Sequence, residues 1–315
     1  MSSLSQRIAT LSVSATLAMA NKSRELIAQG IDIINLSIGE PDFDTPLFIK
    51  KAAQNALDEN YTHYTPVAGY LELREAVALK FKRDNNLDFS ANQIVVSTGA
   101  KQAISNVFFS IIDPGDEVIV PAPFWVSYTE MIKLVEGIPK VIPTAAENNF
   151  KISTQKLRDS ITEKTKAIIF SSPCNPSGNH YSKEELYELA QVIKDFPRII
   201  VISDEIYEHI NFGSKHESLA QFNEVKDQVV TINGVSKAWA MTGWRLGYIG
   251  ASKQIADACT KVQGQFTSGT CSIAQKASIA AMDADPIVLK EMISAFSNRR
   301  ELVLNALNTI NGVKT

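Results

Sequence analysis

Seven short apolar runs rich in β-branched residues alternate with longer segments of helical period along most of this chain. The runs, which are the predicted strands, are residues 94–97, 117–120, 140–142, 167–171, 199–203, 229–232 and 246–250. Helical patterns occupy residues 46–59, 71–83, 101–112, 125–136, 183–194 and 254–263. Strands without a polar face, separated by helices, indicate a mainly parallel sheet that is covered by helices on both faces. The predicted fold class is therefore α/β.

The length of the chain allows more than one domain. It has 315 residues, of which 45% are hydrophobic, and this is enough for a large core. The segments 14–45 and 284–315 flank the region that carries the strands. We expect them to pack together as a smaller domain, with residues 46–283 as the large domain and residues 1–13 as an N-terminal arm. No low-complexity linker marks these boundaries.

Composition disfavours several classes of protein. The net charge is −3, with 31 basic and 34 acidic residues, so we expect no nucleic-acid partner. Three cysteines without a CxxC motif fit a reducing cytoplasm, and four histidines without HExxH disfavour a metal enzyme. The apolar stretch at residues 8–20 is interrupted by serines and threonines, so a signal peptide is not expected, and no uninterrupted run is long enough to span a bilayer.

The segment 233–247 carries the strongest chemical signal. Lys237 follows a predicted strand and stands among small and aromatic residues, and Arg245 lies eight positions further on between Trp244 and Leu246. A desolvated lysine near another cation has a lowered pKa and can act as a nucleophile or base. The Arg245 guanidinium and the Ser236 hydroxyl can bind a phosphate. The alternative, a surface lysine, fits these neighbours poorly.

Asp204 ends the predicted strand 199–203, and Tyr207 follows three residues later. Ligands of open α/β sheets bind outside the carboxyl ends of the strands, where a carboxylate can keep a pyridine nitrogen protonated. Tyr207 can then donate a hydrogen bond to a ring hydroxyl. The alternative is a helix N-cap at Asp204, a role for which aspartate is well suited.

Three further turns follow predicted strands. Asn175 lies between two prolines in the segment 172–178, which presents its amide as a donor unless the segment is an ordinary turn. Gly99 and Ala100 join a strand to a helix, where free backbone amides can bind phosphate, although such junctions are common. Trp125 can stack on a flat ring or simply fill the core.

Taken together, these motifs resemble the class I (fold type I) aminotransferases that depend on pyridoxal 5′-phosphate (PLP), closest to the bacterial subgroup of aspartate aminotransferases. The resemblance extends from about Val13 to the end and keeps the order and spacing of five motifs. It implies a mainly parallel seven-stranded sheet, a smaller α/β domain and PLP as cofactor. Lys237 resembles the Schiff-base lysine and proton carrier, and Asp204 the partner of the pyridine nitrogen. Tyr207 and Asn175 resemble the donors to the ring oxygen.

The resemblance also assigns the remaining site residues. Trp125 is similar to the stacking ring, and Gly39, in the motif 38–46, to the glycine that meets the substrate carboxylate. The expected phosphate site consists of Gly99, Ala100, Ser236 and Arg245, and the expected substrate-binding residues are Gly39, Lys101, Trp125 and Asn175.

Lys101 and Tyr64 carry two further implications of the resemblance. Lys101, which is also counted among the cofactor-binding residues, is similar to the lysine that binds the distal carboxylate of an acidic substrate. Tyr64 is similar to the tyrosine that reaches the phosphate of a neighbouring subunit, and Thr267 and Ser268 are candidates for the same role. A shared site implies a symmetric homodimer.

The implied reaction is transamination between aspartate and 2-oxoglutarate. Alternatives are an aminotransferase for aromatic amino acids or prephenate, a lyase with the same cofactor, a ligand-sensing domain of a transcription regulator, or an inactive fragment that still binds PLP. The family continues for several tens of residues beyond the counterpart of Thr315 and has there an arginine that clamps the α-carboxylate. Arg299 and Arg300 do not match that motif and are expected to be exposed helix residues. We therefore expect the C-terminal part of the small domain to be absent from this chain.

Overall fold

The computed structural model describes residues 4–13, 15–36, 39–213, 215–313 and 315. Its centre is a seven-stranded sheet in the order β1-β7-β6-β5-β4-β2-β3. The strands are β1 (Ile94–Ser97), β2 (Glu117–Ala122), β3 (Ile138–Pro143), β4 (Thr165–Ser171), β5 (Ile200–Asp204), β6 (Val229–Gly234) and β7 (Gly247–Gly250). Only β7 runs antiparallel to its two neighbours, so the prediction of a mainly parallel sheet is confirmed.

Helices precede, connect and follow the strands. They are α3 (Leu47–Asp58), α4 (Leu71–Asn85), α5 (Ala100–Ile111), α6 (Ser127–Leu134), α7 (Thr154–Ser160), α8 (Lys183–Ile193), α9 (Lys253–Phe266) and α10 (Ser272–Asp283). All of these except α7 and α10 fall in segments whose period predicts a helix. The start of α8 shows the local reason: the Ser182 hydroxyl accepts from the Glu185 amide, and the Glu185 carboxylate accepts from the Ser182 amide. This capping box satisfies two backbone donors that the first turn of a helix leaves without partners.

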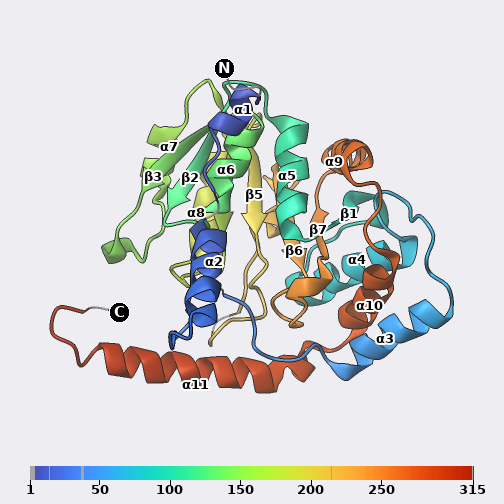
Figure 1. Ribbon diagram of the computed structural model, residues 1–315. Helices are drawn as coiled ribbons and strands as arrows, with labels where there is room; N and C mark the ends of the chain where they lie inside the picture. Colours follow the sequence, from blue (N-terminus) through green and yellow to red (C-terminus); the bar gives the residue numbers. More distant parts are fainter. Residues whose placement is uncertain (1–3, 14, 37–38, 214, 314) are drawn as a thin grey trace.

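Alternate residues of each strand pack on opposite faces of the sheet. Val95 packs with apolar residues of α5, α6 and α9, whereas Ile94 and Val96 pack with α3, α4, α7, α8 and α10. The two core clusters therefore cover both faces, which explains why the strands lack a polar face. Figure 1 shows the helices of the two layers on either side of the strands.

Three helices lie outside the sheet-bearing region. They are α1 (Gln6–Ala9), α2 (Ala15–Ala28) and α11 (Lys290–Leu307), and α11 runs along one end of the molecule (Figure 1). The division into an arm, a small domain and a large domain stays a prediction. Among the described residues, no helix combines the length and apolar character that crossing a membrane requires.

A buried ionic cluster ties α4 to the segment that follows β5. The Lys80 ammonium, 2% exposed, contacts the Glu208 carboxylate and donates to Asn85 Oδ1 at 2.8 Å. His209 Nε2 lies 3.2 Å from Glu208 Oε1 and 3.6 Å from Asp84 Oδ2. Asp84, Glu208 and His209 are grouped as metal ligands are, but the Lys80 ammonium already supplies the positive charge beside the two carboxylates. The cluster is therefore explained as an ion-pair network.

Replacing Lys80 by methionine is expected to lower the free energy of unfolding by about 3–5 kcal/mol, because it leaves the buried Glu208 carboxylate without its cation. Burial alone would raise the pKa of Glu208, but Lys80 and His209 hold that pKa well below its usual range. The advantage of the wild type over Lys80→Met should therefore be present at neutral pH and shrink as the pH falls and Glu208 takes up a proton. Urea unfolding at two pH values measures both effects.

Lys82→Met is the matched control, because Lys82 lies on the same helix and pairs with Asp88 at the surface. It should change the free energy of unfolding by less than about 1 kcal/mol. A double change of Lys80 and Glu208 to apolar residues should recover much of the loss. Equal effects of Lys80→Met and Lys82→Met would contradict a stabilising buried pair.

Candidate active site

The sheet topology brings the predicted site residues to one edge. Strands β1, β2, β4, β5 and β6 are mutually parallel, so their carboxyl ends share that edge. The last residue of β5 is Asp204, and the turns that follow β1, β2, β4 and β6 carry Gly99, Trp125, Asn175 and Lys237. This is the position at which ligands of open α/β sheets bind.

A cavity of about 680 Å³ opens at this edge. Lys237, Tyr207, Asn175 and Gly39 are among the residues that line it. Helix α11 closes part of it with Phe296, Arg299, Arg300 and Val303. The two arginines are exposed helix residues, as expected, but they also face this cavity, and Arg299 Nη1 donates to Asp42 Oδ1 at 2.7 Å.

Lys237 lies in the turn after β6, with its amine directed into the cavity. Its Nζ donates to the Gly39 carbonyl oxygen at 2.8 Å and lies 5.7 Å from the centre of the Tyr207 ring. Burial lowers the pKa of Lys237, Arg245 lowers it further, and Glu40 and Asp204 act against this shift. A lysine with a lowered pKa more readily presents the neutral amine that a nucleophile or a general base requires.

Asp204 is buried, with 4% of its surface exposed. Burial raises its pKa to about 6, although hydrogen bonds from Tyr128 and from the Ile206 amide favour the ionised form. The Ile206 amide donates to Asp204 Oδ1 at 3.3 Å, so the carboxylate makes a local turn contact, but it ends a strand and does not cap a helix. At neutral pH the site therefore holds a buried carboxylate that prefers a positively charged or proton-donating partner.

Sequence reasoning missed Tyr128. This tyrosine, 1% exposed on α6, donates its hydroxyl proton to Asp204 Oδ2 at 2.5 Å. The two residues are 76 positions apart, so no local spacing links them. The nearest signal is that Tyr128 follows Trp125 at helical spacing and packs edge-on against its ring at 5.5 Å. Tyr128 fixes the orientation of the carboxylate on which the site depends.

Tyr128→Phe is expected to raise the pKa of Asp204 above about 6 by roughly one to two units, because a hydrogen bond to a charged group contributes about 1.5–3 kcal/mol. The acidic limb of the pH–rate profile should move to higher pH by the same amount. Tyr181→Phe is the control, since the Tyr181 hydroxyl accepts from the Ile152 amide instead. An unchanged profile in Tyr128→Phe would show that the Asp204 contact has no effect on its protonation.

Arg245 and Gly99 form a close-packed cradle. Arg245 adopts φ 53°, and its Nη1 donates to the Thr242 carbonyl at 3.0 Å. Gly99 adopts φ +83°, which favours glycine, and a Cβ added there would lie 2.3 Å from Arg245 Nη2, so the guanidinium would have to shift. Gly99 is the N-cap of α5, and Ala100 and Lys101 begin that helix. A guanidinium beside the amino end of a helix suits a phosphate.

Several predicted residues do not line the 680 Å³ cavity, Lys101 and Trp125 among them. The Lys101 ammonium stands over the Trp125 ring, 4.9 Å from its centre. Lys101 lines a different cavity together with residues 11–13 and residues of α6. Burial lowers the pKa of Lys101, and the charge of Arg245 lowers it further. Lys101 is thus in electrostatic reach of the cradle without facing the amine of Lys237.

The structure also shows where the other predicted site residues lie. Asn175 Nδ2 donates to the Tyr207 hydroxyl at 3.5 Å, and burial raises the pKa of Tyr207 to about 12. Ser236 is buried beside Lys237. The Thr267 hydroxyl accepts from Gln102 on α5 at 2.8 Å, and its neighbour Ser268 has φ 59°. Tyr64 is 97% exposed.

These residues fit the groups of PLP. An amine of lowered pKa suits its aldehyde, a buried carboxylate suits its pyridine nitrogen, and the Arg245 guanidinium beside the amino end of α5 suits its phosphate. The donors are arranged on one sheet edge, as such a ligand requires.

Comparison with known proteins identifies the family to which the chain belongs. The family model described as aminotransferase class I and II matches residues 31–315. The chain belongs to this family, and its fold is that of the fold type I aminotransferases.

Two individual relatives show the degree of similarity within this family. The chain is 43% identical to the bifunctional aspartate aminotransferase and glutamate/aspartate-prephenate aminotransferase of Petunia hybrida, over 99% of this chain and 66% of that protein. It is 46% identical to the aspartate/prephenate aminotransferase of Nitrosomonas europaea, over 98% of this chain and 79% of the relative. The chain therefore spans about two thirds to four fifths of the length of these relatives.

Two solved structures of aspartate aminotransferases superpose closely. That of the Rhizobium meliloti enzyme matches with a TM-score of 0.96 at 39% identity, covering 99% of this chain and 78% of the other. That of the Thermus thermophilus enzyme with maleate matches with a TM-score of 0.95 at 41% identity, covering 98% and 81%.

Proposed function

We propose that this chain carries the PLP-binding site of an aminotransferase that moves an amino group between aspartate and 2-oxoglutarate. The observation that carries the proposal is the amine of Lys237, directed into a cavity that Tyr207 and Asn175 also line. A buried carboxylate at Asp204 and the cradle at Gly99 and Arg245 support it. When bound, PLP supplies an aldehyde that condenses with amines and a ring that withdraws electrons from the substrate.

Each site residue has its own role in the proposed reaction. The Lys237 Nζ, once free, takes the proton from the α-carbon of the substrate and returns it on the product side as a general base and acid. Asp204 holds the proton of the ring nitrogen through its ionised carboxylate. Tyr207 and Asn175 donate to the ring oxygen. Arg245, Ser236 and the amides of Gly99 and Ala100 bind the phosphate, and Trp125 stacks on the ring.

Substrate binding is assigned to Gly39, Lys101, Trp125 and Asn175. Lys101 binds the distal carboxylate of an acidic substrate, and its ammonium lies 4.9 Å from the centre of the Trp125 ring. Prephenate is a second candidate substrate, because two relatives are named as prephenate aminotransferases. The exposure of Tyr64 supports a homodimer in which this side chain reaches the site of the partner. Three cysteines without a CxxC motif support a cytoplasmic enzyme, and the net charge of −3 argues against a nucleic-acid partner.

Borohydride reduction of the protein with PLP should fix the cofactor to a single peptide that contains Lys237. Single-turnover measurements then compare aspartate, glutamate and aromatic amino acids as donors, and 2-oxoglutarate and prephenate as acceptors. A faster reaction with the acidic donors is expected because of Lys101. Fixation at another lysine, or none at all, would refute the proposed site, and a preference for aromatic donors would refute the proposed substrate.

A further inference from the structure

A second buried carboxylate lies directly after Asp204. Glu205 is fully buried, with 0% of its surface exposed, and its amide donates to the Ile232 carbonyl of β6 at 2.9 Å. Consecutive residues of an extended segment point to opposite faces. The side chains of Glu205 and Asp204 therefore point to opposite sides of the chain. A buried charge is costly unless it is paired and hydrogen-bonded, so its surroundings require an explanation.

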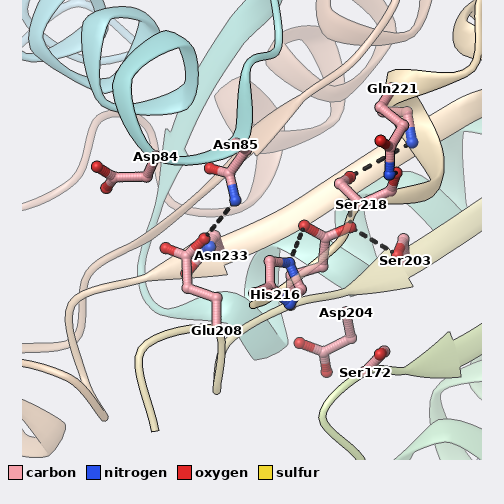
Figure 2. Close-up of polar contacts among 12 residues, drawn as sticks. Asp84, Asn85, Ser172, Ser203, Asp204, Glu208, His216, Ser218, Gln221 and Asn233 are labelled. Carbon is pink, nitrogen blue, oxygen red and sulfur yellow. Dashed lines mark hydrogen bonds and ion pairs between the residues drawn. The ribbon is translucent and has the colours of Figure 1, made fainter. Parts of the chain in front are cut away.

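Glu205 is fully coordinated by polar side chains. Oε1 accepts from the hydroxyls of Ser203 at 2.8 Å and Ser218 at 2.7 Å. Oε2 lies 2.9 Å from His216 Nε2, and the side chains of Glu205 and His216 are 1% and 8% exposed. Figure 2 shows the bonds from Ser203, Ser218 and His216, with Asp204 apart from them. The carboxylate is thus held on three sides, one of them by an ionisable ring.

The charges around His216 favour its protonated form. Burial alone would lower the pKa of His216, but the hydrogen bond and charge of Glu205 and the charge of Glu208 raise it above the usual value, against Lys80. His180 also senses the charge of His216. A protonated ring makes the pair with Glu205 neutral. His216 Nδ1, however, is buried without a hydrogen-bond partner among the described residues, so the protonation of this nitrogen is the point to measure.

The state of this pair bears on Asp204. Tyr128, the Ile206 amide and Lys237 favour the ionised form of Asp204, whereas burial and the charge of Glu205 favour the protonated form. An unpaired Glu205 would therefore make Asp204 harder to ionise. Two adjacent carboxylates with different partners can keep separate protonation states, because only one of them is neutralised by a cation.

We propose that the Glu205–His216 pair is a positioning element for Asp204, which holds the end of β5 and cancels the charge of Glu205 so that Asp204 stays ionised. The functional importance of an ionised Asp204 rests on the proposed function. The existence of the Glu205–His216 pair does not. Ser203 and Ser218 fix the Glu205 carboxylate, and His216 supplies the positive charge. The pair lies behind the strand end and touches neither cofactor nor substrate.

The first test measures His216 in the protein without PLP. In protein labelled with ¹⁵N-histidine, the Nδ1 and Nε2 shifts of His216 should report a doubly protonated ring that titrates above the usual histidine value, and Glu205→Gln should move this titration to lower pH. His209→Gln is the control, because His209 pairs with Glu208 and Asp84 rather than with Glu205. A neutral His216 ring throughout the range from pH 6 to pH 8 would overturn the proposal.

The second test separates charge from structure. The pKa of Asp204 is followed by ¹³C-carboxyl shifts in the wild type, His216→Gln, Glu205→Gln and the double variant, with Asp204→Asn identifying the signal. His216→Gln keeps an amide donor but leaves Glu205 uncompensated, so the pKa of Asp204 should rise by about one unit, a tenfold change in its ionisation equilibrium. The double variant removes both charges and should return that pKa toward the wild-type value.

The double variant also decides between a charge and a packing role. If the pair only supports packing, the double variant should be at least as perturbed as either single variant, and this result would overturn the proposal. If His216→Gln does not fold, recovery of folding and of the Asp204 titration in the double variant still supports charge compensation, and failure of both variants overturns it. A wild-type protein that binds no PLP would refute the proposed function. The titrations would still show whether the Glu205–His216 pair keeps Asp204 ionised.

Discussion

Lys237→Ala is expected to lower the rate of transamination by about 10²–10⁴-fold, because it removes the group that carries the substrate proton. Its amine is directed into the cavity and donates to the Gly39 carbonyl, so it lies where such a proton must be transferred. The loss should appear in kcat rather than in KM, since a proton-transfer group acts mainly in the transition state. The measurement is single-turnover conversion of the PLP form by aspartate.

Two controls make this result specific. A small primary amine added to Lys237→Ala should restore part of the rate, because it supplies the missing base from solution. Lys276→Ala should react like the wild type, since Lys276 contacts Tyr61, Tyr70 and Glu72 outside the cavity. Activity of Lys237→Ala near the wild-type level would exclude Lys237 as the proton carrier.

Local pattern was sufficient to predict the sheet and the chemical residues at its edge. The predicted strand at residues 94–97 coincides with β1, and the other predicted strands overlap the observed ones. Asp204 and Lys237 were placed after strands because β-rich runs precede them. Parallel strands then bring such turns together regardless of their separation in sequence. This is why a mainly parallel sheet could be predicted together with the set of candidate residues at its edge.

The contacts that tune the site could not be predicted in this way. Tyr128 and Asp204 meet across 76 positions, and His216 reaches Glu205 from a segment without regular helix or strand structure. Neither pairing follows from periodicity, because each depends on how α6 and the segment after β5 pack on the sheet. The helix α10 was also missed, since its small residues pack against α3 and α4 and give a weak amphipathic pattern.

The contribution of α11 to the cavity wall could not be predicted from the sequence for a different reason. Exposed positions for Arg299 and Arg300 were expected and are observed, yet exposure does not reveal that both residues line the cavity. The ion pair of Arg299 with Asp42 joins residues 257 positions apart. Contacts of this kind depend on the relative placement of segments at the two ends of the chain, for which the sequence offers no local signal.

Asp204→Asn is expected to lower the transamination rate by about 10²–10³-fold, the effect of losing one preorganised electrostatic group, while stabilising the protein without PLP. Burial raises the pKa of Asp204 to about 6 from 3.8. A shift of about 2 pKa units corresponds to about 3 kcal/mol of stability. The folded protein loses this stability as the pH rises from about 4 to about 6, because Asp204 releases its proton at a lower pH in the unfolded chain than in the folded protein.

Asparagine removes this cost, so the gain in unfolding free energy should be small at pH 4 and approach about 3 kcal/mol at pH 8. Asparagine also keeps an oxygen for the Tyr128 hydroxyl, which limits the structural disturbance. Urea unfolding of the protein without PLP at pH 4, 6 and 8 measures the gain, and Asp195→Asn, a surface carboxylate paired with Arg158, is the control. A variant that is less stable than the wild type at pH 8 would mean that the carboxylate stabilises the fold, and Asp204 would then be a structural rather than a cofactor-binding group.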